Sequence, residues 1–314
     1  MPPIAPHPES VFHTASGREV QLKVHRALWS EDFPENSLAA IEQCLRAPVA
    51  RTEIDIAMLR DSDFLVLHDR ELYPSTSGAG PVGALTRSDV TTLLLRAERG
   101  GAVTTHRPPL LSAVAALVGD IPGPTLIELD MTDSDPLPWP RVEELVRMVE
   151  PVRDRFVFNG PDWNMRRLLT FDPALRTSAS TGGLDWAPEG SEDERELRLP
   201  RAAYGYLDAH PLAVRRTGSV NDYLADRFGG MLRLVPGASE AHVRLTLFER
   251  MLDDGVADAA ALFHRHGLAL DVWTLNADTP RWRERLARAV AAGVDIVTTD
   301  TPREVAAAGA GMVG

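Results

Sequence analysis

The chain has 314 residues, and 33 Lys and Arg against 45 Asp and Glu give a formal net charge of −12 at pH 7. With 44% hydrophobic and 25% charged residues, the composition is that of a globular protein and argues against a disordered chain. The acidic balance argues against a nucleic-acid partner, and no apolar stretch reaches the roughly 20 residues of a membrane-spanning helix.

The beginning of the chain and its cysteine content bear on the compartment. Residues 1–18 have no basic segment followed by an apolar one, so we expect a flexible lead-in and no signal peptide. Cys44 is the only cysteine, and its position in an amphipathic helical pattern predicts a buried, inert thiol. These features favour a cytoplasmic protein. The length allows one large domain or two average ones, and we expect a single domain over residues 19–314. No feature of the sequence predicts an oligomeric state.

Short apolar runs rich in β-branched residues alternate with longer helical patterns along the chain. The expected strands span residues 20–25, 53–58, 64–68, 125–130, 156–159, 175–179, 232–235, 269–275 and 295–299. The expected helices span residues 37–46, 88–96, 111–118, 142–149, 164–171, 240–252, 257–266, 280–291 and 302–308. Residues 182–229 interrupt this rhythm with a charged run, and we expect a loop-rich elaboration there.

Repeated strand–helix units require a parallel sheet with helical crossovers. About eight such units favour a closed (β/α)8 TIM barrel with loop insertions, and an open doubly wound sheet is the alternative. No Gly-x-Gly-x-x-Gly motif opens a helix after the first strand, and no Walker-type loop occurs. Their absence from the sequence argues against a nucleotide-binding sheet.

Two of the expected strands carry pairs of carboxylates. In TEIDIAM, side-chain alternation places Glu53 and Asp55 on one face, and in TLIELDM it places Glu128 and Asp130 together in the same way. In a barrel these faces point inward, where carboxylates are unfavourable unless a cation lies between them. Such oxygen ligands suit one divalent cation, Mg²⁺ or Ca²⁺. Exposed edge strands or buried ion pairs are the alternatives, but the repetition favours a metal site.

Two histidines lie at the carboxyl ends of expected strands, His25 in KVHRA and His68 in FLVLHDR. Barrel active sites assemble at this end of the strands. Imidazole titrates near neutrality, so two histidines beside an acidic metal cluster are interpreted as a general base and a general acid. The sequence suggests no partner for His242.

Several motifs occur in a fixed order over most of the chain. They are His25-Arg26, Pro34-Glu35-Asn36-Ser37, Glu53-x-Asp55, His68-Asp69, Gly78-x-Gly80, Glu128, VWTLN around Trp273, and GVDIVTTDTP ending at Pro302. This series resembles the glycerophosphodiester phosphodiesterase family, and residues 182–229 are the part that the resemblance covers least.

The resemblance implies a TIM barrel that hydrolyses a small-molecule phosphodiester to a phosphomonoester and an alcohol. It implies one divalent metal held by Glu53, Asp55 and Glu128. His25 would be the base, His68 the acid, Arg26 would lie beside the phosphate and Trp273 would line the pocket. For Trp273, a packed core tryptophan is an equally good interpretation.

Three positions depart from the family pattern. Ala27 stands where glycine is usual, Asp130 replaces a lysine that would face the phosphate, and Pro74 replaces an arginine. Either Asp130 takes part in metal ligation or the substrate is altered, for example by a cationic or sugar group. Two further functions stay open: a lyase-type transphosphorylase that forms a cyclic phosphate, and a catalytically weakened binding or accessory protein. The presence of every expected acid–base and metal residue disfavours the latter.

Overall fold

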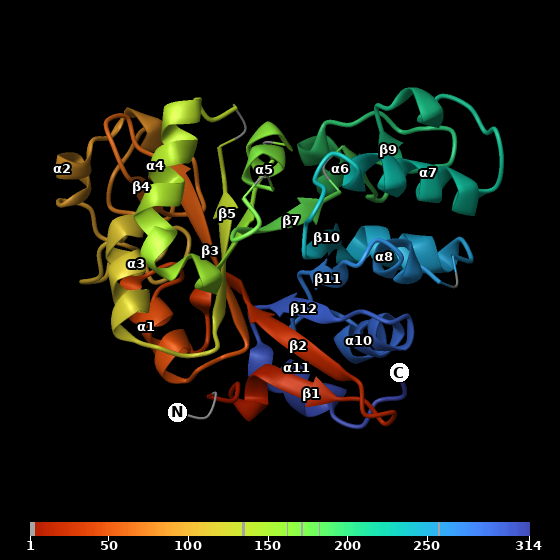
Figure 1. Ribbon diagram of the computed structural model, residues 1–314, viewed down its shortest axis with the longest axis horizontal. Coiled ribbons are helices and arrows are strands. Elements are labelled where there is room, and N and C mark those ends of the chain that lie inside the picture. The colour runs from red at the N-terminus through yellow and green to blue at the C-terminus, as the bar shows by residue number, and fades with distance from the viewer. Residues whose placement is uncertain (1–3, 134–135, 162, 171, 182, 257) are drawn as a thin grey trace.

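A computed structural model describes residues 4–133, 136–161, 163–170, 172–181, 183–256 and 258–314. Within these ranges, eight parallel strands close into a barrel, because β2 pairs with β12 on one side and with β3 on the other (Figure 1). In barrel order the strands are β2 (Glu19–Val24), β3 (Arg51–Met58), β5 (Leu126–Met131), β6 (Phe156–Asn159), β7 (Arg176–Ser180), β10 (Glu240–Arg244), β11 (Ala269–Trp273) and β12 (Ile296–Thr299). The predicted (β/α)8 barrel is confirmed.

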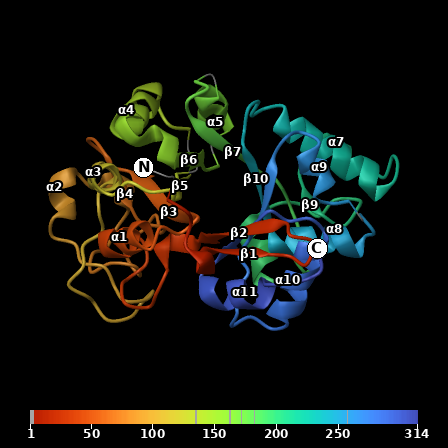
Figure 2. The same ribbon diagram turned by 60° about the horizontal axis from the view of Figure 1, so that its bottom comes forward.

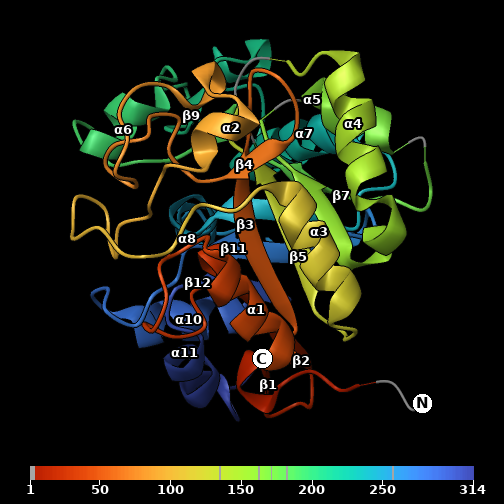
Figure 3. The same ribbon diagram turned by 90° about the vertical axis from the view of Figure 1, so that its left-hand side faces the viewer.

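Helices surround the barrel, as the views in Figures 2 and 3 show from two further directions. The α-helices are α1 (Leu38–Arg46), α2 (Arg87–Val90), α3 (Leu111–Asp120), α4 (Trp139–Val149), α5 (Trp163–Leu169), α6 (Glu192–Leu197), α7 (Val220–Leu232), α8 (Leu245–Asp253), α9 (Ala261–His264), α10 (Trp282–Ala291) and α11 (Pro302–Gly309). Short 3-10 helices are η1 (Pro8–Ser10), η2 (His25–Ala27), η3 (Val82–Ala84), η4 (Glu150–Arg155) and η5 (Pro211–Ala213).

Side-chain alternation in β3 and β5 separates apolar from charged residues as predicted. Ile54 and Ile56 of β3 and Ile127 and Leu129 of β5 are buried in one core together with residues of α1, α3 and α4. Burying an aliphatic side chain of this size contributes about 1.5–3 kcal/mol, which fixes these faces toward the helices. The carboxylates on the opposite faces are thereby directed into the barrel. Cys44 of α1 belongs to the same core, as predicted.

The apolar run at residues 64–68 forms β4 (Phe64–Val66), but β4 pairs antiparallel with β3 outside the closed barrel. Only residues 59–63 separate the two strands. A parallel pair needs a crossover of about a dozen residues, so a hairpin is the remaining geometry. The Leu67 amide donates to the Asp55 carbonyl (3.1 Å), which brings His68 beside the carboxylates of β3.

The predicted strand at residues 232–235 is wrong, and so is the start of the predicted helix at residue 240. A capping box between Ser219 and Asp222 begins α7, which continues to Leu232. β10 then covers Glu240–Arg244, and α8 begins only at Leu245. Only Ala241 and Val243 form the apolar face of β10. The strand therefore lacks the longer apolar run that usually indicates a buried strand in a sequence.

The segment before β2, expected to be a flexible lead-in, contains η1 and β1 (Val11–His13). β1 pairs antiparallel with β2, and the buried ring of Phe12 lies against Gly309 of α11, where any Cβ would collide with it. Figure 1 shows β1 and α11 side by side at the base of the molecule.

The elaboration after β7 contains short elements in its described part. β8 (Leu184–Asp185) pairs antiparallel with β9 (Leu207–Asp208), and the charged run forms the exposed helix α6 between them. The longer helix α7 packs Tyr223 and Phe228 into the core shared with α8 and α9. No helix in the described ranges combines the length and apolarity needed to cross a bilayer.

Candidate active site

A cavity of about 1050 Å³ lies at the carboxyl ends of the barrel strands. All eight side chains selected from the sequence line it: His25, Arg26, Glu53, Asp55, His68, Glu128, Asp130 and Trp273. The fold explains this convergence, because a closed parallel barrel points the carboxyl ends of its strands toward one mouth, where barrel active sites form.

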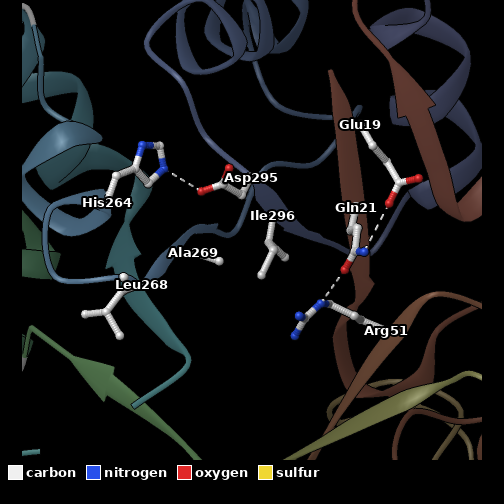
Figure 4. A pocket seen from close by; sticks show the side chains of 9 residues that line it. Glu19, Gln21, Arg51, His264, Leu268, Ala269, Asp295 and Ile296 are labelled. Carbon is white, nitrogen blue, oxygen red and sulfur yellow. Dashed lines mark hydrogen bonds and ion pairs between the residues drawn. The ribbon is translucent and has the colours of Figure 1, made fainter. Parts of the chain in front are cut away.

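A second cavity of about 420 Å³ lies at the opposite, amino-terminal end (Figure 4). It is lined by Glu19, Gln21, Arg51, His264 and Asp295, among others, and none of the eight selected residues contributes to it. The candidate catalytic groups therefore all belong to the larger cavity.

The turn after β2 positions Arg26 at the cavity wall. Arg26 and Ala27 have φ values of 49° and 59°, in the left-handed region that favours glycine, which explains why glycine is usual at the position of Ala27. The Arg26 amide donates to Glu53 Oε2 (2.9 Å), and the guanidinium lies 3.2 Å from both Glu35 oxygens and 3.4 Å from Asp55 Oδ2. Arg26, which follows β2, is thus joined to β3 by a hydrogen bond to Glu53 and an ion pair with Asp55.

The Pro-Glu-Asn-Ser motif has a structural explanation in the same region. Asn36 is buried and its amide donates to Asp55 Oδ2 (2.8 Å), while its carbonyl oxygen accepts from the Asp55 amide (3.2 Å). The next residue, Ser37, caps α1 by accepting from the Ala40 amide (3.1 Å). The motif therefore fixes Asp55 and starts the first helix.

Glu53, Asp55 and Asp130 form one carboxylate cluster, with one oxygen of each within 4.8 Å of the others. Glu53 is 4% exposed, and no donor in the described part of the chain lies within hydrogen-bond distance of its Oε1. Burial, and next to it the Asp55 carboxylate, raises the pKa of Glu53 well above its usual range. Burial and the Glu128 carboxylate raise the pKa of Asp130 to about 7. Full ionisation of these three carboxylates is therefore unfavourable unless a cation joins the cluster.

Glu128 lies in a different environment. Its Oε2 accepts a short hydrogen bond from Lys23 Nζ, and its Oε1 accepts from Asn159 Nδ2 (3.0 Å) and lies 3.2 Å from His242 Nδ1. Burial opposes ionisation of Glu128, but the charges of His242 and Lys23 outweigh it and lower the pKa to about 2. The Glu128 carboxylate is ionised and already paired.

Lys23 is the centre of a second cluster that sequence reasoning missed. Its ammonium lies 3.1 Å from Glu240 Oε1, 2.7 Å from Asp271 Oδ2 and 3.1 Å from His242 Nε2, in addition to Glu128. All of these side chains are at most 5% exposed. Burial lowers the pKa of His242, but the Glu128 carboxylate outweighs it and raises that pKa to about 9.

A hydrogen bond to Asp300 orients His25. His25 Nδ1 lies 2.7 Å from Asp300 Oδ1, and Asn276 Nδ2 donates to the other oxygen of the same carboxylate (2.5 Å). Burial raises the pKa of Asp300, but the hydrogen bond from His25 outweighs it, so the pKa is lowered. An ionised Asp300 accepts the Nδ1 proton and leaves Nε2, 3.9 Å from Glu53 Oε2, as the basic nitrogen in the cavity.

His68 has a similar partner at a more open position. Its side chain is 38% exposed, and Nδ1 lies 3.3 Å from Asp69 Oδ1. Asp69 also accepts from Ser75 Oγ and lies 2.8 Å from Arg99 Nη1. The Asp69 carboxylate is thereby fixed where it can orient the imidazole.

Trp273 is 37% exposed at the cavity wall and is not packed in the core. The Arg244 guanidinium lies 5.1 Å from the centre of its ring, and Arg244 Nε lies 3.2 Å from Asp185 Oδ2. Asp185 belongs to β8, so the elaboration after β7 supports the arginine that flanks this indole.

The raised pKa values predict how the stability of the metal-free protein depends on pH. The folded state binds the Asp130 proton more tightly than the unfolded state, whose carboxyl pKa is about 3.9, so folding is weakened as pH rises from about 4 to 7. We expect the Tm of chelator-treated protein to fall between pH 5 and pH 7. Differential scanning calorimetry checks this, and Asp130→Asn should flatten the slope. A Tm that rises over this interval with the same slope in both proteins would contradict the expectation.

The comparisons with known proteins agree with this geometry. The sequence profile of the glycerophosphoryl diester phosphodiesterase family matches residues 25–182. A glycerophosphodiester phosphodiesterase of Caldanaerobacter subterraneus subsp. tengcongensis is 29% identical over 91 residues, which are 29% of this chain and 37% of that protein. The matched segment thus spans little more than a third of this relative.

Solved structures of the same fold cover almost the whole chain. A glycerophosphoryl diester phosphodiesterase from Parabacteroides distasonis has a TM-score of 0.58 at 20% identity and covers 98% of this chain and 92% of its own. An Oleispira antarctica phosphodiesterase in complex with the product sn-glycerol-3-phosphate has a TM-score of 0.57 at 15% identity. The match covers 92% of this chain and 96% of that protein's chain. At these identities the likeness supports the barrel. The profile match over half of the chain shows that this protein belongs to the glycerophosphoryl diester phosphodiesterase family.

Proposed function

We propose that the protein is a metal-dependent phosphodiesterase that hydrolyses a glycerophosphodiester-like small molecule to a phosphomonoester and an alcohol. The observation that carries this proposal is the convergence of His25, His68 and a carboxylate cluster able to hold a metal on one cavity. Family membership supports the reaction class, and the product bound to the Oleispira antarctica relative supports a small phosphate ester as the ligand.

The residues at the centre of the cavity fit a hard divalent cation. Glu53, Asp55 and a carboxylate of β5 would supply the oxygen ligands, and the buried Glu53 Oε1 has no donor among the described residues. When bound, Mg²⁺ or Ca²⁺ would neutralise charge on the phosphoryl oxygens and lower the pKa of a hydroxyl group at the site. The Arg26 guanidinium adds a second positive charge at the cavity wall.

The two histidines would move the protons. Nε2 of His25 accepts the proton of the attacking water as its oxygen bonds to phosphorus, while Asp300 stabilises the imidazolium through Nδ1. The bond from phosphorus to the alcohol oxygen breaks, and His68 donates a proton to that oxygen. The greater exposure of His68 suits contact with a leaving group at the mouth of the cavity.

The products test this reaction. Purified protein with Mg²⁺ or Ca²⁺ should convert glycerophosphoethanolamine or glycerophosphocholine to a phosphomonoester, followed by ³¹P NMR. A cyclic phosphate that accumulates and persists would instead identify a transphosphorylase, in which a neighbouring hydroxyl of the substrate attacks. The absence of metal-dependent turnover across a panel of such diesters would contradict the proposal.

Asp300 is expected to act as a positioning residue for His25. Asp300→Asn keeps the size of the side chain but removes the charge that stabilises the His25 imidazolium, so kcat should fall by about 10²–10⁴-fold. KM and the affinity for the divalent metal should change less than about threefold, because Asp300 lies outside the carboxylate cluster. Steady-state kinetics and calorimetric metal titration check this split. A variant that loses metal affinity in step with kcat would show a structural role instead.

A further inference from the structure

The two inward carboxylates of β5 belong to different clusters. Glu128 and Asp130 are two residues apart on one face of the strand, so they lie at successive levels of the barrel interior. Asp130 groups with Glu53 and Asp55, whereas Glu128 groups with Glu240, His242 and Asp271. The register sets Glu128 opposite Glu53 and Asp130 opposite Asp55, but of the two it is Asp130 that has an oxygen within 4.8 Å of oxygens of both Glu53 and Asp55.

The cluster around Glu128 already contains its cations. Lys23 contacts Glu128, Glu240 and Asp271 at once, and Arg51 Nη1 lies 2.5 Å from the second oxygen of Glu240. Arg51 reaches Glu240 from the amino-terminal end of the barrel, where Figure 4 shows its hydrogen bond to Gln21. Three carboxylates thus share a lysine, an arginine and the imidazole of His242, which leaves little charge for a metal ion to neutralise.

The cluster around Asp130 is compensated less directly. Arg26 lies 3.4 Å from Asp55 but is shared with Glu35, and the charges of His242 and Arg166 also act on Asp130. Among the described residues, Asp130 accepts one long hydrogen bond, from Asn159 Nδ2 (3.3 Å), and the buried Glu53 Oε1 accepts none. Both oxygens of Glu128, by contrast, are already occupied by Lys23, Asn159 and His242.

We propose that Glu53, Asp55 and Asp130 hold the divalent metal, and that Lys23 keeps Glu128 out of its coordination shell as a permanent internal cation. This inference rests on the proposed function, because it concerns the metal of the same site. The inference explains why Asp130 is compatible with this cavity at a position where the family usually has lysine. Here Lys23 of β2 supplies a positive charge instead, at the level of Glu128 in the barrel interior.

A pair of matched variants tests which carboxylate binds the metal. Asp130→Asn and Glu128→Gln each replace a carboxylate with an amide of equal size on the same strand. Isothermal titration calorimetry with Mg²⁺ or Ca²⁺ should show that Asp130→Asn raises the metal Kd by at least about 100-fold, beyond the 10–100-fold typical of outer-shell partners. Glu128→Gln should raise it by less than about tenfold. A Kd that rises as much or more in Glu128→Gln than in Asp130→Asn would overturn the proposal.

The role of Lys23 is tested by counting bound ions with inductively coupled plasma mass spectrometry. Lys23→Met removes the cation shared by Glu128, Glu240 and Asp271, so the variant should bind two divalent ions where the wild type binds one. Lys23→Arg keeps the charge and should bind one. One ion in both variants, with both folded by circular dichroism, would overturn the exclusion of Glu128. If Lys23→Met does not fold, the Asp130 and Glu128 pair still decides the ligand.

These measurements also separate this inference from the proposed function. Wild-type protein that binds one metal and turns over diester, with Glu128 as the sensitive position, would overturn the inference and leave the phosphodiesterase proposal standing. Wild-type protein that binds no divalent ion would overturn both.

Discussion

His25→Ala is expected to lower kcat by about 10²–10⁴-fold, because it removes the base that accepts the nucleophile's proton. The fold should be retained, since the side chain of His25 is 21% exposed at the cavity wall and lies outside the apolar core. Steady-state kinetics on a glycerophosphodiester, with the Tm of both proteins, measures the effect.

A matched control for this variant is His13→Ala, which removes an exposed imidazole from β1 without touching the cavity. Its kcat should stay within about twofold of the wild type. Equal rates for His25→Ala and the wild type would remove His25 from the mechanism, and a similar result for His68→Ala would remove the acid.

Glu53→Gln is the second variant for which we expect a large effect. Glu53 contributes a buried oxygen without a donor among the described residues, so the change to an amide should abolish metal binding and activity together. In the wild type, a metal concentration 100 times Kd should stabilise the fold by about 2.7 kcal/mol, which raises Tm by several degrees. In Glu53→Gln this rise should disappear.

The control for Glu53→Gln is Glu71→Gln, which changes an exposed carboxylate of the same cavity. It should keep the metal-induced rise in Tm. If Glu53→Gln retained the full rise and the full kcat, Glu53 would not be a metal ligand and the cluster would need another explanation.

Much of the barrel could be predicted because its strands and helices carry local signals. Acidic and aliphatic residues alternate over residues 53–56 of β3 and 127–130 of β5, and α1 begins at a serine cap. The antiparallel β4 was predicted as a strand, but its pairing follows from the short connection of residues 59–63, which is too short for a crossover helix. Connection length therefore carries topological information that the apolar pattern alone does not.

β10 and the Lys23 cluster could not be predicted in the same way, because their polar side chains form hydrogen bonds and ion pairs with residues of other strands. Glu240 and His242 on β10 face the interior, as do Lys23 on β2 and Asp271 on β11. Alternation within EAHVR places Glu240 and His242 on one face, and this was the available signal. In the sequence, these charged residues are also typical of the exposed face of a helix. The structure shows that they contact Lys23 of β2, which lies more than 200 residues earlier in the chain and carries no local signal of this contact.

The residues selected for the candidate site come together in the structure, although some elements around them were predicted wrongly. All eight selected residues line one cavity, because most of them face the barrel interior or follow a barrel strand, while the antiparallel pairing of β4 with β3 brings in His68. The partners that orient them, such as Asn36 for Asp55 and Asp300 for His25, belong to the motifs that carried the family resemblance. What the motifs do not contain is the distribution of cations, and this decides between Glu128 and Asp130.

The central claim is that a divalent ion in the carboxylate cluster is required for phosphodiester hydrolysis. Its most direct test is the initial rate of phosphomonoester release from glycerophosphoethanolamine by protein stripped with a chelator and then titrated with Mg²⁺ or Ca²⁺. We predict no turnover without metal, and a rate that saturates at one ion per chain with the same midpoint as calorimetric binding. Full turnover by the stripped protein, insensitive to added metal, would contradict the account.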